Sequence, residues 1–450
     1  MKVLLINAPI RLEAKPNCIP YGLAAIASVL REAGFEVEIY DLNARRPAKD
    51  EIRKELERKT WDVVGMSGLI TTYGFQCWLS GVLKELNPDG LVVSGGGLAT
   101  SSSDLLFENS RIDVAVIGEG EQTMPALCRT VERGGDLGSV RGLRFRKNGR
   151  IVETPKRPNI KDLDTIPFPA WDLLPMEIYL ANPIWGNAAK NSSGFKKDIA
   201  VNRSMNVISS RGCPFSCRYC YHLFGASSYR CRSAENVFEE VCALVDHYHV
   251  DFVGFVDDNM MAHVPRLLDF CRMMEKGGVP VRWGCHGRVT SAKPEVLEKM
   301  AAAGCVWIGY GIESGSQKML DAMNKKATVA QARQAILNTR RAGIYANTTF
   351  IFGYPGETRE TIQQTVQFKR ELGIACGSFF ATPYPGTVLY EQIRDRIRDE
   401  EAFIRSLGNA TEFSINLTEF SDEELLTLKA AMDANEDVMC EGSKRLCVAA

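Results

Sequence analysis

The sequence lacks the features that mark membrane, secreted and nucleic-acid-binding proteins. It has no run of about 18 or more apolar residues, so no transmembrane helix and no membrane insertion are expected. The N-terminal apolar run is interrupted by Asn7 and Pro9, and we expect no signal peptide there. The 54 basic and 55 acidic side chains nearly cancel, so no nucleic acid is expected as main partner. We therefore expect a cytoplasmic protein that acts on a small molecule.

Histidine is scarce, and all five histidines follow residue 221. Cysteine is plentiful, with 14 residues, but a cytoplasmic location argues against a disulfide framework. Most cysteines stand singly in apolar segments, where a buried thiol acts as a small hydrophobe; examples are Cys77, Cys128, Cys242, Cys271 and Cys305. Three others, at 213, 217 and 220, are grouped and call for a different explanation.

The length of 450 residues predicts two to four domains, and the chain shows no internal repeat or low-complexity segment. Residues 1–135 alternate short apolar runs with helical patterns, which predicts a doubly wound parallel sheet. Ligands of such sheets bind at the carboxyl ends of the strands. The loops expected there are 7–9, 67–69, 95–100 and 118–123.

Residues 136–200 have a different character. Two short apolar runs flank the turn Asn148-Gly149, which predicts a β-hairpin at 141–154. A proline-rich connector follows to about residue 200. A loop of this length in a compact protein is often functional, for example as a cover over a site.

Alternation of strands and helices resumes at 201–390. Strands are expected at 205–209, 252–256, 281–284, 306–309, 346–352 and 377–382, with helices between them. Six such units predict a partial (β/α)₆ TIM barrel with its chemistry at the carboxyl ends of the strands. Residues 391–450 are expected to form a C-terminal helical segment.

The grouped cysteines follow the first strand of this predicted barrel. Cys213, Cys217 and Cys220 have the spacing C-x₃-C-x₂-C. Thiolates suit both iron–sulfur clusters and zinc. Three thiolates within eight residues can hold one cuboidal cluster and leave its fourth iron open. Zinc remains the alternative, because His222 could complete a tetrahedral set.

The cysteine spacing, with Tyr219 before the last cysteine, resembles the signature of the radical S-adenosylmethionine (SAM) superfamily. The resemblance implies a [4Fe–4S] cluster, reductive cleavage of SAM to a 5′-deoxyadenosyl radical, and a one-electron donor such as flavodoxin or ferredoxin. It also implies that the loops at the strand ends bind SAM. The candidate SAM-binding residues are Tyr219, Asp257, Asp258, Arg288, Glu313, Gly353 and Pro355.

The chain as a whole resembles the branch of this superfamily that carries a cobalamin-binding domain, which includes class B radical SAM methylases and the anaerobic magnesium-protoporphyrin monomethyl ester cyclase. The resemblance covers about residues 1–390 and implies that the first domain is a Rossmann-like, B12-binding domain. The pattern Asp-x-His-x-x-Gly is absent after the first strand, so no histidine of this domain can ligate cobalt. The candidate cobalamin contacts are Ser67, Leu69, Gly95, Gly96, Gly97 and Glu119.

The favoured activity is cobalamin-dependent methylation of an unactivated carbon. Two alternatives stay open: a radical SAM oxidation, cyclisation, rearrangement or other transfer without methylcobalamin, and a non-catalytic iron–sulfur or corrinoid carrier. Cys231, Cys440 and Cys447 lack cluster spacing and are interpreted as structural. Aromatic and imidazole side chains that could line the substrate space, or simply pack, are Tyr221, His222, Phe224, Tyr354 and Tyr384.

Overall fold

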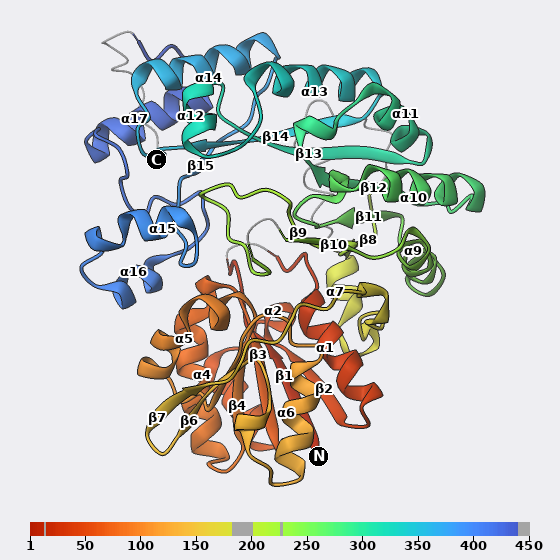
Figure 1. The fold of residues 1–450 in the computed structure, drawn as a ribbon, viewed down its shortest axis with the longest axis vertical. Helices are drawn as coiled ribbons and strands as arrows, with labels where there is room; N and C mark the ends of the chain where they lie inside the picture. The colour runs from red at the N-terminus through yellow and green to blue at the C-terminus, as the bar shows by residue number, and fades with distance from the viewer. Residues whose placement is uncertain (13–14, 182–200, 226–227, 440–450) are drawn as a thin grey trace.

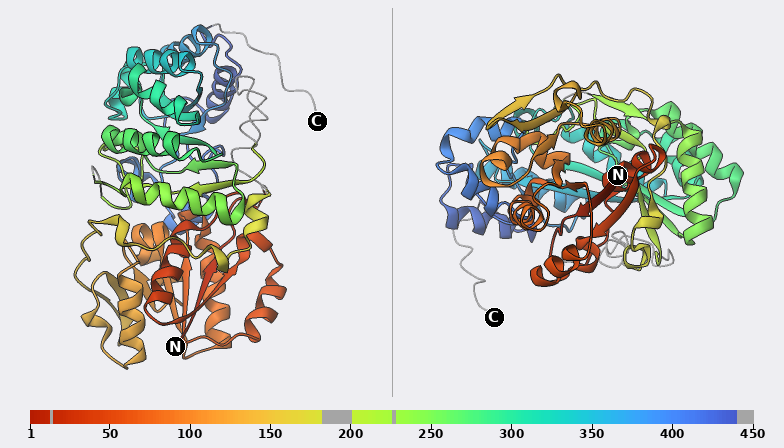
Figure 2. Two further views of the ribbon diagram at one scale, coloured as in Figure 1. Left: turned by 90° about the vertical axis from the view of Figure 1, so that its right-hand side faces the viewer. Right: turned by 90° about the horizontal axis from the view of Figure 1, so that it is seen from below.

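The computed structural model describes residues 1–12, 15–181, 201–225 and 228–439, which form two stacked α/β units. The N-terminal unit lies at the bottom of Figure 1, and the second unit lies at the top with the C-terminal helices beside it. The side view in Figure 2 shows the same stacking along the long axis of the molecule. Within the ranges just given, no helix combines the length and apolar character needed to cross a membrane.

The first unit contains the predicted doubly wound sheet. Its strand order is β2-β1-β3-β4-β5-β6-β7, and the first five strands are parallel. The parallel strands are β1 (Lys2–Asn7), β2 (Glu36–Asp41), β3 (Val63–Ser67), β4 (Leu91–Gly95) and β5 (Val114–Val116). Apart from the edge strand β2, these strands have near-continuous apolar runs, because helices cover both faces of the sheet.

Successive side chains of these strands point to opposite faces and enter different apolar clusters. On β1, Val3 and Leu5 pack with α1 (Tyr21–Glu32) and α6 (Thr123–Glu132). Leu4 and Ile6 join the cluster formed with the helices of the other face. Those helices are α3 (Lys49–Glu57), α4 (Tyr73–Leu86) and α5 (Gly96–Asn109); the short α2 (Leu42–Arg45) follows β2.

The predicted hairpin is present, but it belongs to the first sheet. β6 (Leu143–Lys147) pairs antiparallel with β5, and β7 (Arg150–Glu153) pairs with β6. Asn148 and Gly149 have φ values of 51° and 76°, as a tight hairpin turn requires. The sequence groups the hairpin with the connector beyond residue 135, whereas the structure places it at the open edge of β5. Strand pairing there satisfies backbone groups that would otherwise be exposed.

The second unit is the predicted (β/α)₆ partial barrel. Its six parallel strands are ordered β15-β14-β13-β12-β11-β8. The strands are β8 (Ser204–Val207), β11 (Phe252–Phe255), β12 (Arg282–Gly287), β13 (Cys305–Glu313), β14 (Tyr345–Phe352) and β15 (Phe379–Phe380). The helices are α9 (Ala234–Tyr248), α10 (Val264–Gly277), α11 (Pro294–Ala302), α12 (Gln317–Ala322), α13 (Val329–Arg341) and α14 (Arg359–Glu371). The last strand is shorter than the predicted 377–382.

The described part of the connector links the two units. It contains the 3₁₀ turns η3 (Leu163–Thr165) and η4 (Trp171–Leu173) and the short helix α7 (Met176–Leu180). Ser28 of α1 donates a hydrogen bond to the carbonyl of Phe168 at 2.7 Å. The Trp171 ring meets the ring of Tyr248 edge-on, with centroids 6.0 Å apart. The cover that we expected over a site falls partly on residues 182–200, which lie outside the described residues.

The C-terminal segment contacts both units. α17 (Asp422–Asp433) places Leu425 and Met432 in an apolar cluster with Ile362 and Val366 of α14. α16 (Glu400–Ser406) reaches the first unit instead, where Ile404 joins the core behind α4. The helices predicted after residue 390 are therefore present, and α15 (Val388–Ile393) precedes them.

Candidate active site

The three grouped cysteines lie in a loop framed by a small two-stranded sheet. β9 (Ser210–Gly212) precedes the loop and pairs antiparallel with β10 (Tyr229–Cys231), which follows it. Gly212 has a φ of 78°, and a Cβ there would lie 2.2 Å from the carbonyl oxygen of Ser228. Only glycine fits this position, so the local sequence fixes the direction in which the loop leaves β9. Cys231 belongs to β10 and pairs with Ser210.

The cysteine loop is anchored to the far side of the barrel by backbone hydrogen bonds. The amide of Arg218 donates to the carbonyl of Met323 at 3.0 Å, and the Asn324 side chain donates to the carbonyl of Ser216 at 2.8 Å. The amide of Leu389 donates to the carbonyl of Arg218 at 2.8 Å. The loop is thus held between the end of α12 and the start of α15.

The three thiols lie in a partly buried environment, where a bound metal cluster would stabilise their thiolate form. Cys217 is buried, and Cys213 and Cys220 are half-buried. Burial, together with the charge of Asp258, raises the pKa of Cys220 to about 12. A positively charged iron cluster reverses this effect, since metal binding deprotonates a coordinating thiol. The Arg288 guanidinium, 3.5 Å from the sulfur of Cys217, adds further positive charge.

The zinc alternative requires a fourth ligand beside the three thiols. In the described part of the chain, no three His, Cys, Asp or Glu side chains gather around one point as a single ion requires. A cuboidal cluster does not require such convergence, because each thiolate binds a different iron atom. His222, the proposed fourth zinc ligand, has its Nε2 atom buried without a hydrogen-bond partner.

Three of the predicted SAM-binding residues lie together beside the cysteine loop. The Tyr219 hydroxyl donates to the Glu313 carboxylate at 2.8 Å, and Glu313 has a φ of 66° that is unusual outside glycine. Arg288 is buried, stacks on the Phe215 ring with its guanidinium carbon 3.7 Å from the centroid, and donates to the carbonyl of Lys325. These three of the seven candidates therefore lie close together.

Lys325 was missed by the sequence analysis. Its ammonium group donates to Glu313 at 2.6 Å and to the Tyr219 hydroxyl at 3.1 Å. The side chain is 9% exposed, which is rare for lysine unless it is paired. Nothing in the sequence separates it from the neighbouring Lys326, and only the fold shows that it is buried.

Asp257 and Asp258 have different environments at the end of β11. The Asp257 carboxylate is buried and accepts hydrogen bonds from the backbone and hydroxyl of Ser209 and from the hydroxyl of Ser210. These contacts tie Asp257 to the chain leading into the cysteine loop. Asp258 keeps solvent access, and desolvation in the cleft together with the Asp257 charge raises its pKa. Asn259, which follows, has both amide atoms buried without a partner and was not selected from the sequence.

Gly353 and Pro355 lie in the turn after β14. Gly353 has a φ of 76°, and its amide donates to the Glu357 carboxyl group at 2.5 Å. Burial raises the pKa of Glu357 to about 8. The Tyr354 hydroxyl is buried without a partner. This turn therefore places the backbone of Gly353 and the unpartnered Tyr354 hydroxyl at the carboxyl end of the barrel.

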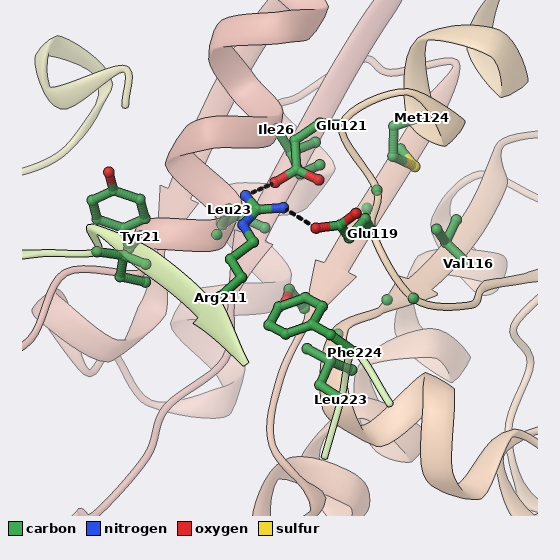
Figure 3. Close-up of a pocket in the computed structure, with 18 of the residues that line it drawn as sticks. Tyr21, Leu23, Ile26, Val116, Glu119, Glu121, Met124, Arg211, Leu223 and Phe224 are labelled. Atoms are coloured by element: carbon green, nitrogen blue, oxygen red, sulfur yellow. Dashed lines mark hydrogen bonds and ion pairs between the residues drawn. The ribbon is translucent and has the colours of Figure 1, made fainter. Parts of the chain in front are cut away.

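A first cavity of about 280 Å³ lies between the cysteine-bearing half of the barrel and the first unit (Figure 3). Four predicted cobalamin contacts line it: Ser67, Gly95 and Gly96 from the ends of β3 and β4, and Glu119 from the loop after β5. Asp257 and Asp258 line the opposite wall. The predicted site thus lies between the two units.

A second cavity of about 340 Å³ is lined by Leu69 and Gly97, the two remaining predicted cobalamin contacts. Tyr221 and Tyr384 of the second unit complete its walls. The Tyr221 hydroxyl donates to the carbonyl of Gly97 at 3.2 Å. The predicted contacts are therefore shared between two cavities that adjoin at the chain segment 95–97.

The two cavities together, with their glycine-rich walls, suit a corrinoid. Each cavity by itself lies near the lower end of the range that holds small ligands, and the two adjoin at residues 95–97. Glycines such as Gly95 leave backbone open to a ligand along the first cavity. Gly96 has a different reason, because its φ is 78° and a Cβ there would lie 2.8 Å from the Ser67 hydroxyl. Because residues 1–135 contain no histidine, no imidazole from the first unit can lie below the ring.

Charged residues that the sequence analysis did not single out cross the boundary beside the first cavity (Figure 3). Arg211 of β9 is paired with Glu119 at 2.7 Å and with Glu121. Arg230 of β10 is paired with Glu119 at 2.9 Å. We name Arg211, Arg230, Glu119 and Glu121 the boundary cluster. Glu119, predicted as a cobalamin contact, therefore has its carboxylate already engaged by two arginines.

The remaining candidates for the substrate space take several positions. Phe224 lines the first cavity, and Tyr221 and Tyr384 line the second. Tyr354 belongs to an apolar cluster with Met319 and Leu389 and is better described as packing. Cys440 and Cys447 lie outside the described residues.

Comparison with known proteins agrees with this geometry. Residues 207–368 match the radical SAM superfamily, and residues 8–128 match the B12 binding domain. An uncharacterised methyltransferase, PH0819, of Pyrococcus horikoshii is 32% identical over 87% of this chain and 83% of its own length. The anaerobic magnesium-protoporphyrin IX monomethyl ester cyclase of Rubrivivax gelatinosus is 30% identical over 86% of this chain and 68% of its own length.

The fold is also found among solved structures. The radical SAM methyltransferase TsrM from Kitasatospora setae, solved with cobalamin and a [4Fe–4S] cluster bound, superposes with a TM-score of 0.70 at 20% identity. The match covers 88% of this chain and 75% of that protein. The predicted arrangement of a Rossmann-like domain followed by a partial barrel is thereby confirmed.

Proposed function

This chain belongs to the radical SAM enzymes that carry an N-terminal B12-binding domain, and we propose that it methylates an unactivated carbon of a small molecule with cobalamin as cofactor. The observation that carries the proposal is the first cavity. It is lined on one side by glycines at the ends of β3 and β4 and on the other by Asp257 and Asp258, at the end of the barrel that bears the cysteine loop. A carrier of electrons or of corrinoid would need no such shared chamber, so the carrier alternative is not favoured.

Cys213, Cys217 and Cys220 would hold the cluster, and Arg288, Glu313 and Tyr219 would contact SAM beside it. When bound, these groups supply a 5′-deoxyadenosyl radical that abstracts hydrogen, and the corrinoid supplies a methyl group. A one-electron donor of the flavodoxin or ferredoxin type would provide the electron, and we place the enzyme in the cytoplasm.

The protein's own side chains would position the groups that contact SAM and would exclude water from the site. Lys325 neutralises Glu313 and fixes the Tyr219 hydroxyl, so these groups are preorganised before SAM arrives. The guanidinium of Arg288 is held on both sides, by the Phe215 ring and by the carbonyl of Lys325. A guanidinium that is already fixed loses little conformational entropy on binding a carboxylate. Arg288 is therefore favoured as the partner of the carboxylate in the amino-acid part of SAM.

The corrinoid would occupy both cavities, with Ser67, Gly95 and Gly96 in the first and Leu69 and Gly97 in the second. Tyr221 stands between them through its hydrogen bond to Gly97. It lies one residue after Cys220, so it is placed to separate the cluster from the corrinoid and to contact substrate. Leu69 is 58% exposed, as expected for an apolar side chain that a bound group would cover.

The second candidate function is radical SAM chemistry without methylcobalamin. This candidate is supported by the 30% identity to a cyclase, because the similarity to that relative extends over both domains of this chain. The experiment is anaerobic purification with cobalamin supplied, followed by incubation with SAM and a reductant. The methylase proposal expects a bound corrinoid chromophore, iron near four atoms per chain and 5′-deoxyadenosine. Absence of corrinoid after careful reconstitution would favour the second candidate, whereas absence of 5′-deoxyadenosine with an intact cluster would contradict both.

A further inference from the structure

One carboxylate of the first unit contacts both ends of the cysteine loop. Glu119 accepts hydrogen bonds from Arg211 at 2.7 Å and from Arg230 at 2.9 and 3.0 Å. Arg211 and Arg230 are directly paired across β9 and β10, so they mark the base of the loop that contains all three cysteines. Glu119 therefore joins the two ends of that loop from the neighbouring unit.

The boundary cluster is buried, and its two arginines balance its two glutamates in charge, although Nε and Nη2 of Arg230 have no hydrogen-bond partner among the described residues. Side-chain exposure is 4% for Glu119 and 7% for Glu121, against 13% for Arg211 and 14% for Arg230. The Phe224 ring lies beside both guanidinium groups, at 5.8 and 5.4 Å. Without a carboxylate between them, two cations on adjacent strands would repel each other in this weakly polar environment.

Glu119 has little remaining capacity to bind a ligand. Its Oε1 atom accepts from Arg211 and Arg230, and its Oε2 atom accepts from Arg230 and from the backbone amide of Ile160 at 2.6 Å. Ile160 belongs to the connector, and its carbonyl accepts from Arg230 at 2.5 Å. The same carboxylate thus ties three segments together: the loop after β5, the connector and the β9–β10 sheet.

We propose that Glu119 is a positioning residue that holds the base of the cysteine loop in the form that binds the cluster and SAM. The first unit then has a second role that does not depend on corrinoid: it shapes the radical-generating site through Arg211 and Arg230. The identity of the cluster and of SAM rests on the proposed function, but the effect of Glu119 on the shape of the loop does not.

The test compares Glu119→Gln with Glu108→Gln, a matched change at an exposed glutamate of α5 in the same unit. In the metal-free protein, hydrogen exchange of the amides at 213–225 should be faster in Glu119→Gln and unchanged in Glu108→Gln. In the reconstituted protein, KM for SAM should rise about 10–100-fold, the range seen when a supporting contact of a metal site is lost. Corrinoid binding should stay near that of Glu108→Gln, whereas the melting temperature should fall, because removing one partner of a buried ion pair leaves the other charge uncompensated.

A second variant keeps the proposal testable if Glu119→Gln fails to fold. Arg230→Met leaves Glu119 paired with Arg211 and should produce the same change to a smaller degree. Unchanged loop exchange and an unchanged KM for SAM in both variants would overturn the proposal, as would loss of corrinoid with an unaffected loop. Failure of the proposed function is recognised separately, because the wild-type protein would then make no 5′-deoxyadenosine while the exchange comparison still stands.

Discussion

The guanidinium of Arg288 lies 3.5 Å from the sulfur of Cys217, although 70 residues separate them in the chain. Arg288 follows β12, and Cys217 lies in the loop after β8 and β9. Because parallel strands end at the same edge of a sheet, the barrel brings these residues to one site. Their proximity links the proposed SAM contact to the proposed cluster ligand.

Replacement of this guanidinium should weaken SAM binding without removing the cluster. Arg288→Met keeps much of the side-chain volume but loses the charge and the hydrogen bonds to Cys217 and to the carbonyl of Lys325. We expect Kd for SAM to rise at least tenfold, about 1.4 kcal/mol, while iron stays near four atoms per chain. Isothermal titration and iron analysis measure both. Arg272→Met, at a 64% exposed position of α10, is the control; equal behaviour of the two variants would contradict the assignment.

The cysteine assignment predicts a sharp contrast among thiols. Cys217→Ala should abolish formation of 5′-deoxyadenosine, because two thiolates do not hold the cluster in the required form. Cys242→Ala, on α9 outside the loop, should retain activity. Circular dichroism should show both variants folded. Retained turnover in Cys217→Ala would refute the cluster site.

The other cysteines should be dispensable for the cluster. Cys231→Ser, together with Cys440→Ser and Cys447→Ser, should leave the iron content near four atoms per chain and SAM cleavage unchanged. A wild-type iron content near eight, falling to four in this triple variant, would instead indicate a second cluster.

Glu357 should make stability depend on pH in an unusual direction. Its carboxyl group has a pKa of about 8 in the folded protein, against an ordinary value of 4.5, because burial penalises the charge. Between pH 4.5 and 8 the folded state therefore binds more protons at this group than the unfolded state, so its contribution to stability falls as pH rises through this window. Glu357→Gln removes this titration. The melting temperature of Glu357→Gln relative to wild type should be higher at pH 8 than at pH 5.5. An equal difference between the two proteins at both pH values would contradict the prediction.

Two neighbouring glycines should differ in their tolerance of alanine. Gly96 has a φ of 78°, and a Cβ there would meet the Ser67 hydroxyl at 2.8 Å, so Gly96→Ala should cost about 1–2 kcal/mol and reduce corrinoid uptake. At Gly97 a Cβ would lie 3.6 Å from the Tyr221 ring, an ordinary contact. Gly97→Ala should therefore be close to wild type in urea unfolding. Equal or reversed losses of stability in the two variants would contradict the prediction.

The sequence alone determined the cofactor chemistry and the fold class. The spacing of Cys213, Cys217 and Cys220 is local, and so are the apolar runs and helical patterns that define both α/β units. The family resemblance then implied seven SAM contacts in the strand-end loops. The structure brings Tyr219, Arg288 and Glu313 of these together, because parallel strands place their ends at one edge.

The tertiary structure decided what depends on contacts between distant segments. Lys325 is distinguished from Lys326 by burial against Glu313, and Glu119 is engaged by Arg211 and Arg230, which follow it by 92 and 111 residues. Periodicity describes which side of its own element a residue faces, but not which residue of another unit it meets. The pairing of buried charges across the boundary, the division into two cavities and the attachment of the hairpin to β5 all depend on such packing, and so they emerged only from the fold.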